Sequence, residues 1–169
     1  MPVFKPLLKP DFYFDSIFHV PYERLYEQGV RCLIYDIDNT LASHADKRPP
    51  TKIVTLVKKL RGMGFQIGLL SNNSARRLQV FNETMKLPGA SMAAKPFTAI
   101  LRRLMKEMGM NPQETAIIGD QLFADVWCGK RVGVTTVLVK PITEKEVITV
   151  RMKRGLERRV LKRYYEAGV

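Results

Sequence analysis

The chain has 169 residues and a mass of 19.3 kDa, with 28 Lys and Arg against 16 Asp and Glu and a formal net charge of +12. Hydrophobic residues make up 46% of it and charged residues 26%, a globular composition that excludes wholesale disorder or a fibrous repeat. We expect a single domain, residues 1–169, with a core of its own.

The sequence shows no disulfide framework, secretory signal or membrane span. Cys32 and Cys128 are its two cysteines, and we expect both to be free thiols in a reduced cytosol. Proline and charged residues interrupt residues 1–11 every few positions. The longest apolar run, residues 132–139, is far shorter than the ~18–20 residues of a membrane span. We therefore expect a cytoplasmic protein that is soluble or peripheral to a membrane.

Apolar, β-rich runs alternate along the chain with segments of helical periodicity. Strands are predicted at residues 30–35, 65–70, 115–118 and 134–139, and their nearly continuous apolar character is typical of a parallel sheet covered on both faces. Helices are predicted between them, at residues 49–61, 74–85, 96–108 and 122–128. This alternation predicts an α/β fold with a doubly wound, mostly parallel sheet, whose ligand crevice lies at the carboxyl ends of the strands.

Polar side chains stand at the ends of these strands and before one helix. In chain order they are Asp36, Asp38, Ser71, Asn72, Lys95, Asp120 and Asp125. Several carboxylates facing one lysine suit a hard cation with oxygen ligands, and Mg²⁺ fits better than zinc. One carboxylate can act as a nucleophile on phosphorus while its neighbour handles protons. A hydroxyl, an amide and a lysine can hold the phosphoryl oxygens.

These motifs resemble those of the haloacid dehalogenase (HAD) superfamily of phosphatases, in particular its subclass IIIA, typified by YqeG. The resemblance is carried by residues 36–41 (DIDNTL) and 119–133 (GDQLFADVWCGKRVG), and it covers most of residues 12–165. A lone DxD pair is weak evidence, but four motifs in the right order are specific. The resemblance implies a HAD-like fold and a Mg²⁺-dependent phosphatase that works through an aspartyl-phosphate.

The resemblance assigns the acidic residues to catalysis and to the metal. Asp36 is the nucleophile and a Mg²⁺ ligand, and Asp38 is the general acid/base and holds the metal through its backbone carbonyl. Asp120 is a further metal ligand, and Asp125 orients Lys95 or a metal-bound water. The chain departs from the family at Ala124, where Thr or Ser is usual.

The other motif residues are assigned to the substrate. The resemblance implies that Ser71, Asn72 and Lys95 bind the phosphoryl oxygens. It also assigns Lys95 to the catalytic residues. Thr40 is expected to position the acid/base side chain.

No segment is long enough for a cap domain. Superfamily members with caps insert them after the first motif or between the second and third, and here residues 42–48 and 72–94 leave no room for one. An open crevice favours a phosphate carried on something large, such as a lipid, a protein or a nucleic acid.

The two ends of the chain leave alternatives open. Residues 1–29 form an aromatic-rich N-terminal arm, which either packs on the sheet edge or presents an apolar surface to a membrane or partner. Residues 143–169 predict a basic amphipathic helix that begins with a capping box at Thr143–Glu146. Its basic face is either solvated, with the apolar side docked, or it binds anionic lipid or RNA.

The family's relatives include phosphatidylglycerophosphate phosphatases, enzymes of phospholipid metabolism. We therefore expect a Mg²⁺-dependent phosphomonoesterase acting on phosphatidylglycerophosphate at the inner membrane surface. The alternatives are a phosphatase for phosphoprotein, nucleic acid or soluble phosphate esters, and a non-catalytic RNA- or ribosome-associated binding protein. The intact motif residues argue against this last alternative.

Overall fold

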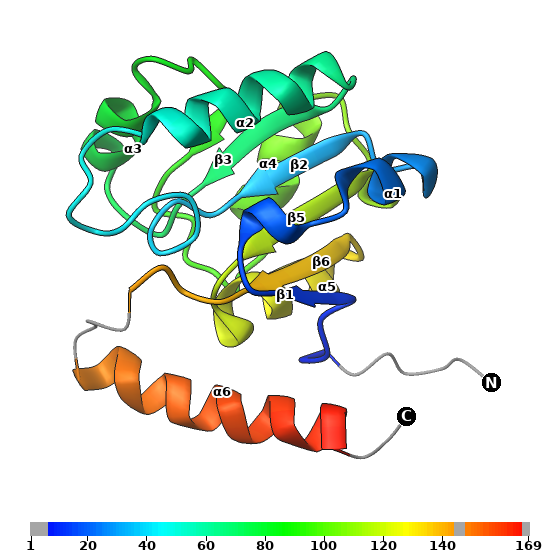
Figure 1. Cartoon of the computed structure of the whole chain (residues 1–169), viewed down its shortest axis with the longest axis vertical. Coiled ribbons are helices and arrows are strands. Elements are labelled where there is room, and N and C mark those ends of the chain that lie inside the picture. The colour runs from blue at the N-terminus through cyan, green and yellow to red at the C-terminus, as the bar shows by residue number, and fades with distance from the viewer. Residues whose placement is uncertain (1–6, 144–147, 167–169) are drawn as a thin grey trace.

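The computed structural model describes residues 7–143 and 148–166, which contain one six-stranded sheet (Figure 1). The strands are β1 (Phe12–Phe14), β2 (Cys32–Tyr35), β3 (Gln66–Leu70), β4 (Gly89–Ala90), β5 (Thr115–Gly119) and β6 (Thr135–Val139). Their order is β1-β6-β5-β2-β3-β4, and every neighbouring pair is parallel. The predicted α/β class with a doubly wound parallel sheet is confirmed.

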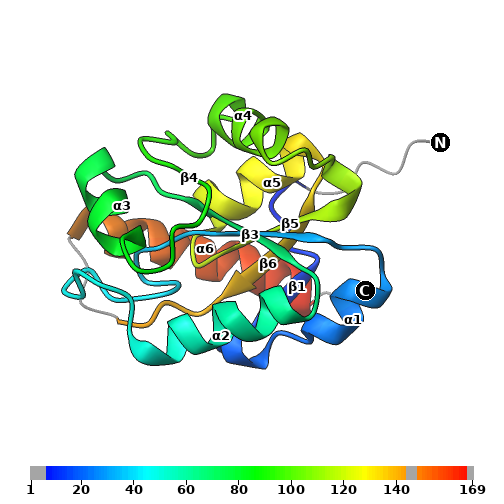
Figure 2. The ribbon, with the colours of Figure 1, turned by 90° about the horizontal axis from the view of Figure 1, so that it is seen from above.

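Helices cover both faces of the sheet, as Figure 2 shows. On one face lie α1 (Tyr22–Glu27) and α2 (Thr51–Gly62), and on the other α4 (Ala99–Glu107) and α5 (Trp127–Val132). In β2, Leu33 and Tyr35 join the core on the α2 side, whereas Cys32 and Ile34 join the core beneath α4 and α5. Because successive side chains of a strand point to opposite faces, one apolar run fills two cores. Both cysteines are buried and free, as predicted.

The N-terminal arm supplies the edge strand of the sheet. β1 pairs with β6, and the Asp11 carboxylate beside it accepts hydrogen bonds from the backbone N–H and the hydroxyl of Thr136, both 2.9 Å long. Tyr22 is buried, and its hydroxyl accepts a hydrogen bond from the Tyr35 hydroxyl at 2.7 Å. Of the two alternatives for the arm, the structure therefore shows packing on the sheet edge for residues 7–29. Phe4 of this arm lies outside the described residues.

Several predicted helix ends differ from the observed ones. α3 (Ala75–Asn82) is capped by Ser74, as the sequence indicates, but it ends before Met85. The reason is that the Asn82 side chain bonds both the N–H (2.9 Å) and the carbonyl (2.6 Å) of Leu87 and closes a turn. α4 begins at Ala99 rather than residue 96.

The predicted helix at residues 122–128 is a π-helical segment, η3 (Leu122–Val126), that continues into α5. Sequence periodicity cannot reveal this change of helix type. The described residues also contain two short 3₁₀ helices, η1 (Ile17–His19) and η2 (Pro112–Glu114).

The C-terminal helix, α6 (Ile148–Glu166), lies along the β1–β6 edge of the sheet (Figure 1). Val160 and Leu161 pack against a cluster formed by Leu122, Val126 and Leu138, so the helix is docked. The proposed capping box falls partly on residues 144–147, which lie outside the described residues. None of the helices in the described part of the chain has the length and apolar character that crossing a membrane requires.

Within residues 7–143 and 148–166 there is no cap domain. The connection from β2 to α2 is a loop, residues 36–50, and the connection from β3 to Lys95 holds little besides α3 and β4. No inserted domain therefore covers the carboxyl ends of the strands in the described part of the chain.

Candidate active site

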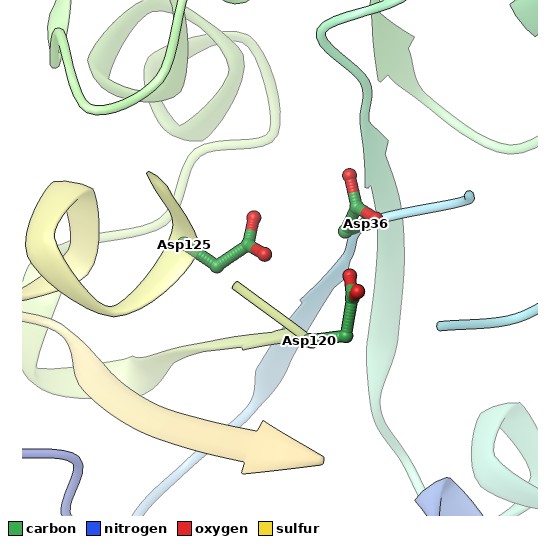
Figure 3. A group of neighbouring side chains, drawn as sticks. All are labelled: Asp36, Asp120 and Asp125. Carbon is green, nitrogen blue, oxygen red and sulfur yellow. The ribbon is translucent and has the colours of Figure 1, made fainter. Parts of the chain in front are cut away.

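Three buried carboxylates meet at the carboxyl ends of β2 and β5. Asp36 follows β2, Asp120 follows β5, and Asp125 comes from η3 (Figure 3). Each offers an oxygen within 4.8 Å of an oxygen of the other two, and we call these three residues the acidic cluster. Parallel strands bring Asp36 and Asp120 to one edge, and the turn after β5 returns Asp125 to it.

Lys95 lies inside the acidic cluster. Its ammonium group is 2.6 Å from an Asp36 oxygen, 2.7 Å from an Asp125 oxygen and 3.0 Å from the Leu70 carbonyl. Burial alone would lower the pKa of Lys95, but the Asp125 and Asp36 carboxylates outweigh it and raise the pKa. Lys95 is therefore a fixed positive charge.

Gly119 makes room for this arrangement. A Cβ atom at this position would lie 2.2 Å from the Asp125 carboxyl carbon, so any larger residue would displace the Asp125 side chain. The Asp125 carboxylate also accepts a hydrogen bond from the backbone N–H of Gln121 at 3.1 Å, which closes the turn that brings it back toward Asp120. The glycine before Asp120 is thus required by the packing of Asp125.

The cluster carries more negative charge than its neighbours neutralise. Burial, followed by the nearby carboxylates, raises the pKa of Asp36 well above its usual range, although Lys95 opposes this. Burial and Asp125 likewise raise the pKa of Asp120 to about 6, against the opposing effects of Arg154 and Thr40. Such crowding is relieved by a hard divalent cation, which prefers oxygen ligands. The residues present therefore fit a divalent metal ion.

Asp38 is separated from the acidic cluster although only one residue lies between it and Asp36. One of its oxygens accepts hydrogen bonds from Nε (3.2 Å) and Nη2 (3.0 Å) of Arg77, and the other lies 3.4 Å from the Asn73 amide nitrogen. His44 Nδ1 lies 3.5 Å from the first oxygen. We call Asp38, His44, Asn73 and Arg77 the rim of the site.

Thr40 contacts the acidic cluster rather than Asp38, the side chain that it was expected to position. Its hydroxyl lies 3.1 Å from an Asp120 oxygen and 3.4 Å from an Asp36 oxygen. The structure thus places the Thr40 hydroxyl against Asp120 and Asp36, and the expected positioning of Asp38 by Thr40 stays a prediction. The turn of residues 37–42 directs the Thr40 side chain inward, whereas Asp38 faces the rim.

Ser71 and Asn72 lie beside Lys95. Ser71 is buried and its hydroxyl accepts a hydrogen bond from the Asn73 backbone N–H at 3.0 Å. The Asn72 side-chain oxygen accepts one from the Lys95 backbone N–H at 2.9 Å, which ties the second motif to the third.

An open pocket of about 260 Å³ joins the acidic cluster to the rim. Its lining consists of Asp36, Asp38, His44, Asn72, Asn73, Lys95, Gln121 and Ala124. Thr40, Ser71, Asp120 and Asp125 lie behind this surface and are themselves buried. Lys95 and Asp36, which form an ion pair with each other, both contribute to this lining.

Sequence reasoning missed three residues of the site. Arg77 is in the first turn of α3, and Arg154 and Glu157 are on α6, where Arg154 contacts Asp120. Arg77 carries no motif signal. The spacing of Arg154 and Glu157 places them on one side of a helix, but many other residues of α6 are charged, so this signal is not distinctive.

Known proteins resemble the chain over most of its length. A family model described as HAD-hydrolase-like matches residues 92–146. The probable phosphatase YqeG of Bacillus subtilis is 32% identical over 157 residues, which are 93% of this chain and 91% of that protein. Phosphatidylglycerophosphate phosphatase 1, chloroplastic/mitochondrial, of Arabidopsis thaliana is 26% identical over 164 residues, 89% of this chain. The match spans only 46% of the plant protein.

Solved structures share the fold. A HAD family enzyme from Bacteroides thetaiotaomicron, in complex with magnesium and inorganic phosphate, has a TM-score of 0.54 and 15% sequence identity, and covers 70% of this chain and 98% of its own. At this identity the likeness establishes the architecture alone.

Proposed function

Because this chain belongs to the haloacid dehalogenase superfamily of phosphatases, we propose that it hydrolyses phosphate monoesters with Mg²⁺, through an aspartyl-phosphate on Asp36. The observation that carries the proposal is the buried acidic cluster with Lys95 at its centre, opening into a polar pocket. Of the three carboxylates in the acidic cluster, Asp36 is the one that also lines this pocket, so it is the one that a substrate can reach.

The metal would be held by the carboxylates of Asp36, Asp120 and Asp125, and by the backbone carbonyl of Asp38. Bound there, Mg²⁺ would offset the charge of the carboxylates and of the phosphoryl oxygens. The likeness of the fold to a HAD enzyme crystallised with magnesium supports this choice of ion.

The protein's own residues account for the remaining steps. An oxygen of the Asp36 carboxylate attacks phosphorus, and the bond to the leaving alcohol breaks while Asp38 gives that alcohol a proton. Asp38 then takes a proton from a water molecule that attacks the phosphoryl group, which releases inorganic phosphate and restores the Asp36 carboxylate. Lys95 remains protonated, and we assign the phosphoryl oxygens to Lys95, Ser71 and Asn72. The Lys95 ammonium now donates to Asp36, Asp125 and the Leu70 carbonyl, so it would exchange one of these partners for a phosphoryl oxygen. Arg77 holds the Asp38 side chain at the mouth, where the leaving alcohol departs.

For the substrate we propose a phospholipid with a terminal phosphate, of the phosphatidylglycerophosphate type. The plant relative of that name supports this class, as does the open pocket. Two exposed apolar residues stand near the pocket. Met92, 71% exposed, donates its backbone N–H to Asn73, and Phe97, 67% exposed, follows Lys95 by two positions. Apolar side chains beside a site, on a protein of net charge +12, suit an anionic lipid surface.

The reaction is tested with p-nitrophenyl phosphate, with and without Mg²⁺. We expect Mg²⁺-dependent hydrolysis, reduced at least about a thousandfold in Asp36→Asn because the nucleophile is lost. Asp15→Asn, which removes an exposed carboxylate paired with Lys140, is the matched control and should keep full activity. Equal rates for Asp36→Asn and the unaltered protein would reject the enzymatic proposal in favour of a binding protein.

The substrate class is tested with four phosphate esters at equal concentration. These are phosphatidylglycerophosphate in anionic vesicles, its soluble headgroup glycerol phosphate, a phosphopeptide and an RNA 3′-phosphate. We expect the highest kcat/KM on the vesicles. Faster turnover of the peptide, the RNA or the soluble headgroup would replace the lipid with that substrate and leave the proposed reaction intact.

A further inference from the structure

The C-terminal helix contacts the segment that carries two of the three clustered carboxylates. Arg154 donates from Nη1 to the backbone carbonyl of Asp120 and pairs through Nη2 with one oxygen of the Asp120 carboxylate. The Asp120 side chain is fully buried and that of Arg154 is 13% exposed. This ion pair joins positions that are 34 residues apart in the sequence.

Glu157 holds the same segment from one helical turn away. One of its oxygens accepts hydrogen bonds from the backbone N–H groups of Leu122 (2.9 Å) and Phe123 (3.4 Å), and the other lies 3.2 Å from Arg154 Nη1. Residues 120, 122 and 123 are therefore all fixed to α6. The segment lies between Asp120 and Asp125, so its position determines how the two carboxylates face each other.

The Asp120 carboxylate is held from two sides. One oxygen receives the Thr40 hydroxyl at 3.1 Å and the other receives Arg154. An ionised carboxylate has about four acceptor positions, so two of them are left for a cation. A side chain fixed in this way is already ordered before a metal ion binds.

We infer that Arg154 is a positioning residue: through its contacts with Asp120 and Glu157, it holds the Asp120 carboxylate ready to bind the divalent cation. The inference rests on the proposed function only in taking Mg²⁺ as that cation. It makes α6 a part of the active site, in addition to any surface that the helix presents to a membrane.

The opposite possibility is that Arg154 substitutes for the metal and must leave before it binds. The contacts favour positioning, because Arg154 also bonds the Asp120 backbone carbonyl and has its own buried acidic partner, Glu157. A mere substitute for the cation would need the Asp120 carboxylate alone. Val160 and Leu161 also pack α6 against Leu122, Val126 and Leu138, so this ion pair is not its sole contact with the rest of the described chain.

The test is Mg²⁺ binding to the full chain, measured by isothermal titration calorimetry without substrate. Arg154→Gln should raise the Kd for Mg²⁺ about 10- to 100-fold, the usual effect of losing a residue that orients a metal ligand. Arg154→Lys, which keeps the charge but not the forked geometry, should fall between Arg154→Gln and the unaltered protein. Arg158→Gln removes the same charge from an exposed position of α6 and is the control.

Kinetics provide the second measurement. In Arg154→Gln the Mg²⁺ concentration for half-maximal activity should rise by the same factor, whereas saturating Mg²⁺ should restore most of kcat and leave KM for p-nitrophenyl phosphate unchanged. Mg²⁺ that binds the folded state would also stabilise a damaged fold, so circular dichroism at the assay temperature must show that Arg154→Gln is folded without Mg²⁺. If circular dichroism shows that Arg154→Gln does not fold, Glu157→Gln serves instead. Its amide oxygen can still accept a hydrogen bond from the Leu122 backbone N–H, whereas the ion pair between residue 157 and Arg154 is lost.

The outcomes separate the two proposals. Unchanged or tighter Mg²⁺ binding by a folded Arg154→Gln would overturn the positioning role, and tighter binding would show that Arg154 competes with the cation. Failure of the unaltered protein to bind Mg²⁺ would overturn the metal assignment in the proposed function, and the positioning role with it.

Discussion

Asp36 and Asp38 belong to one short motif but lie in two different regions of the site. Asp36 is buried in the acidic cluster against Lys95, whereas Asp38 stands at the rim with Arg77 and His44. The acidic cluster combines crowded carboxylates with one fixed lysine, which suits a nucleophile and a metal. The rim offers a carboxylate that lines the pocket, which suits proton transfer. Two carboxylates two residues apart thus have different surroundings, as the two tasks that we propose for them require.

Removing the cation of the acidic cluster should have the largest effect. Lys95→Met leaves Asp36 and Asp125 without their ammonium partner, so we expect activity to fall roughly a hundred- to thousandfold. The free energy of unfolding at pH 7.5 without metal should fall by about 3 kcal/mol, measured in urea. Lys106→Met, at an exposed position of α4, is the control. Near-normal activity of Lys95→Met would show that the cluster does not act on the phosphate.

Gly119 tests whether the cluster depends on close packing. In Gly119→Ala the new Cβ overlaps the Asp125 carboxyl group, so the turn must shift and the free energy of unfolding should fall by about 1–3 kcal/mol. Activity should fall by roughly a hundredfold with it, since Asp125 would leave Lys95. Gly62→Ala, at the end of α2 with nothing within 4 Å of the added atom, should leave both properties intact. A fully active Gly119→Ala would mean that Asp125 is dispensable.

Arg77 tests the rim by itself. Arg77→Gln releases the Asp38 carboxylate, and we expect about a tenfold lower kcat with a loss of about 1–3 kcal/mol in stability, because the ion pair is largely buried. Mg²⁺ binding should change little, because the Arg77 side chain contacts the Asp38 carboxylate, the backbone of residues 46 and 47 and the Phe81 ring, and none of these belongs to the acidic cluster. The exposed neighbour Arg76 provides the control substitution, Arg76→Gln. Weakened Mg²⁺ binding in Arg77→Gln would show that the two regions are not separable.

The smallest effect is a dependence of stability on pH that originates in the acidic cluster. The pKa of Asp120 is raised to about 6 from 3.8, so the folded protein binds a proton more readily than the unfolded chain does. Without metal, this contribution is greatest below pH 4 and is lost as the pH rises through 6, and about 1 kcal/mol of it should be lost between pH 5 and 7.5. Urea unfolding at pH 5 and 7.5 measures it, and Asp120→Asn should remove it. Mg²⁺, which binds ionised carboxylates, should also reduce it, and an unaltered pH dependence in Asp120→Asn would contradict this origin.

Much of the site could be predicted because its residues follow local patterns. The apolar runs at residues 30–35 and 115–118 predict buried parallel strands, and parallel strands bring Asp36 and Asp120 to one edge. The contact between Lys95 and Asp125 was one of two alternatives that the family resemblance allowed. The contacts of Thr40 with Asp120 and Asp36 were not predicted, since a turn rotates successive side chains in ways that residue types do not reveal.

The sequence by itself determined the class of fold and the order of the chemical groups, because strand periodicity and motif spacing are properties of neighbouring residues. Only the tertiary structure decided which carboxylate is buried, which lies at the rim, and that α6 contributes Arg154 and Glu157 to the segment after β5. The physical reason is that burial and ion pairing depend on atoms brought together from distant parts of the chain. The excess of basic residues, read from composition as attraction to phosphate-rich partners, includes at least three side chains engaged within the site: Arg77, Lys95 and Arg154.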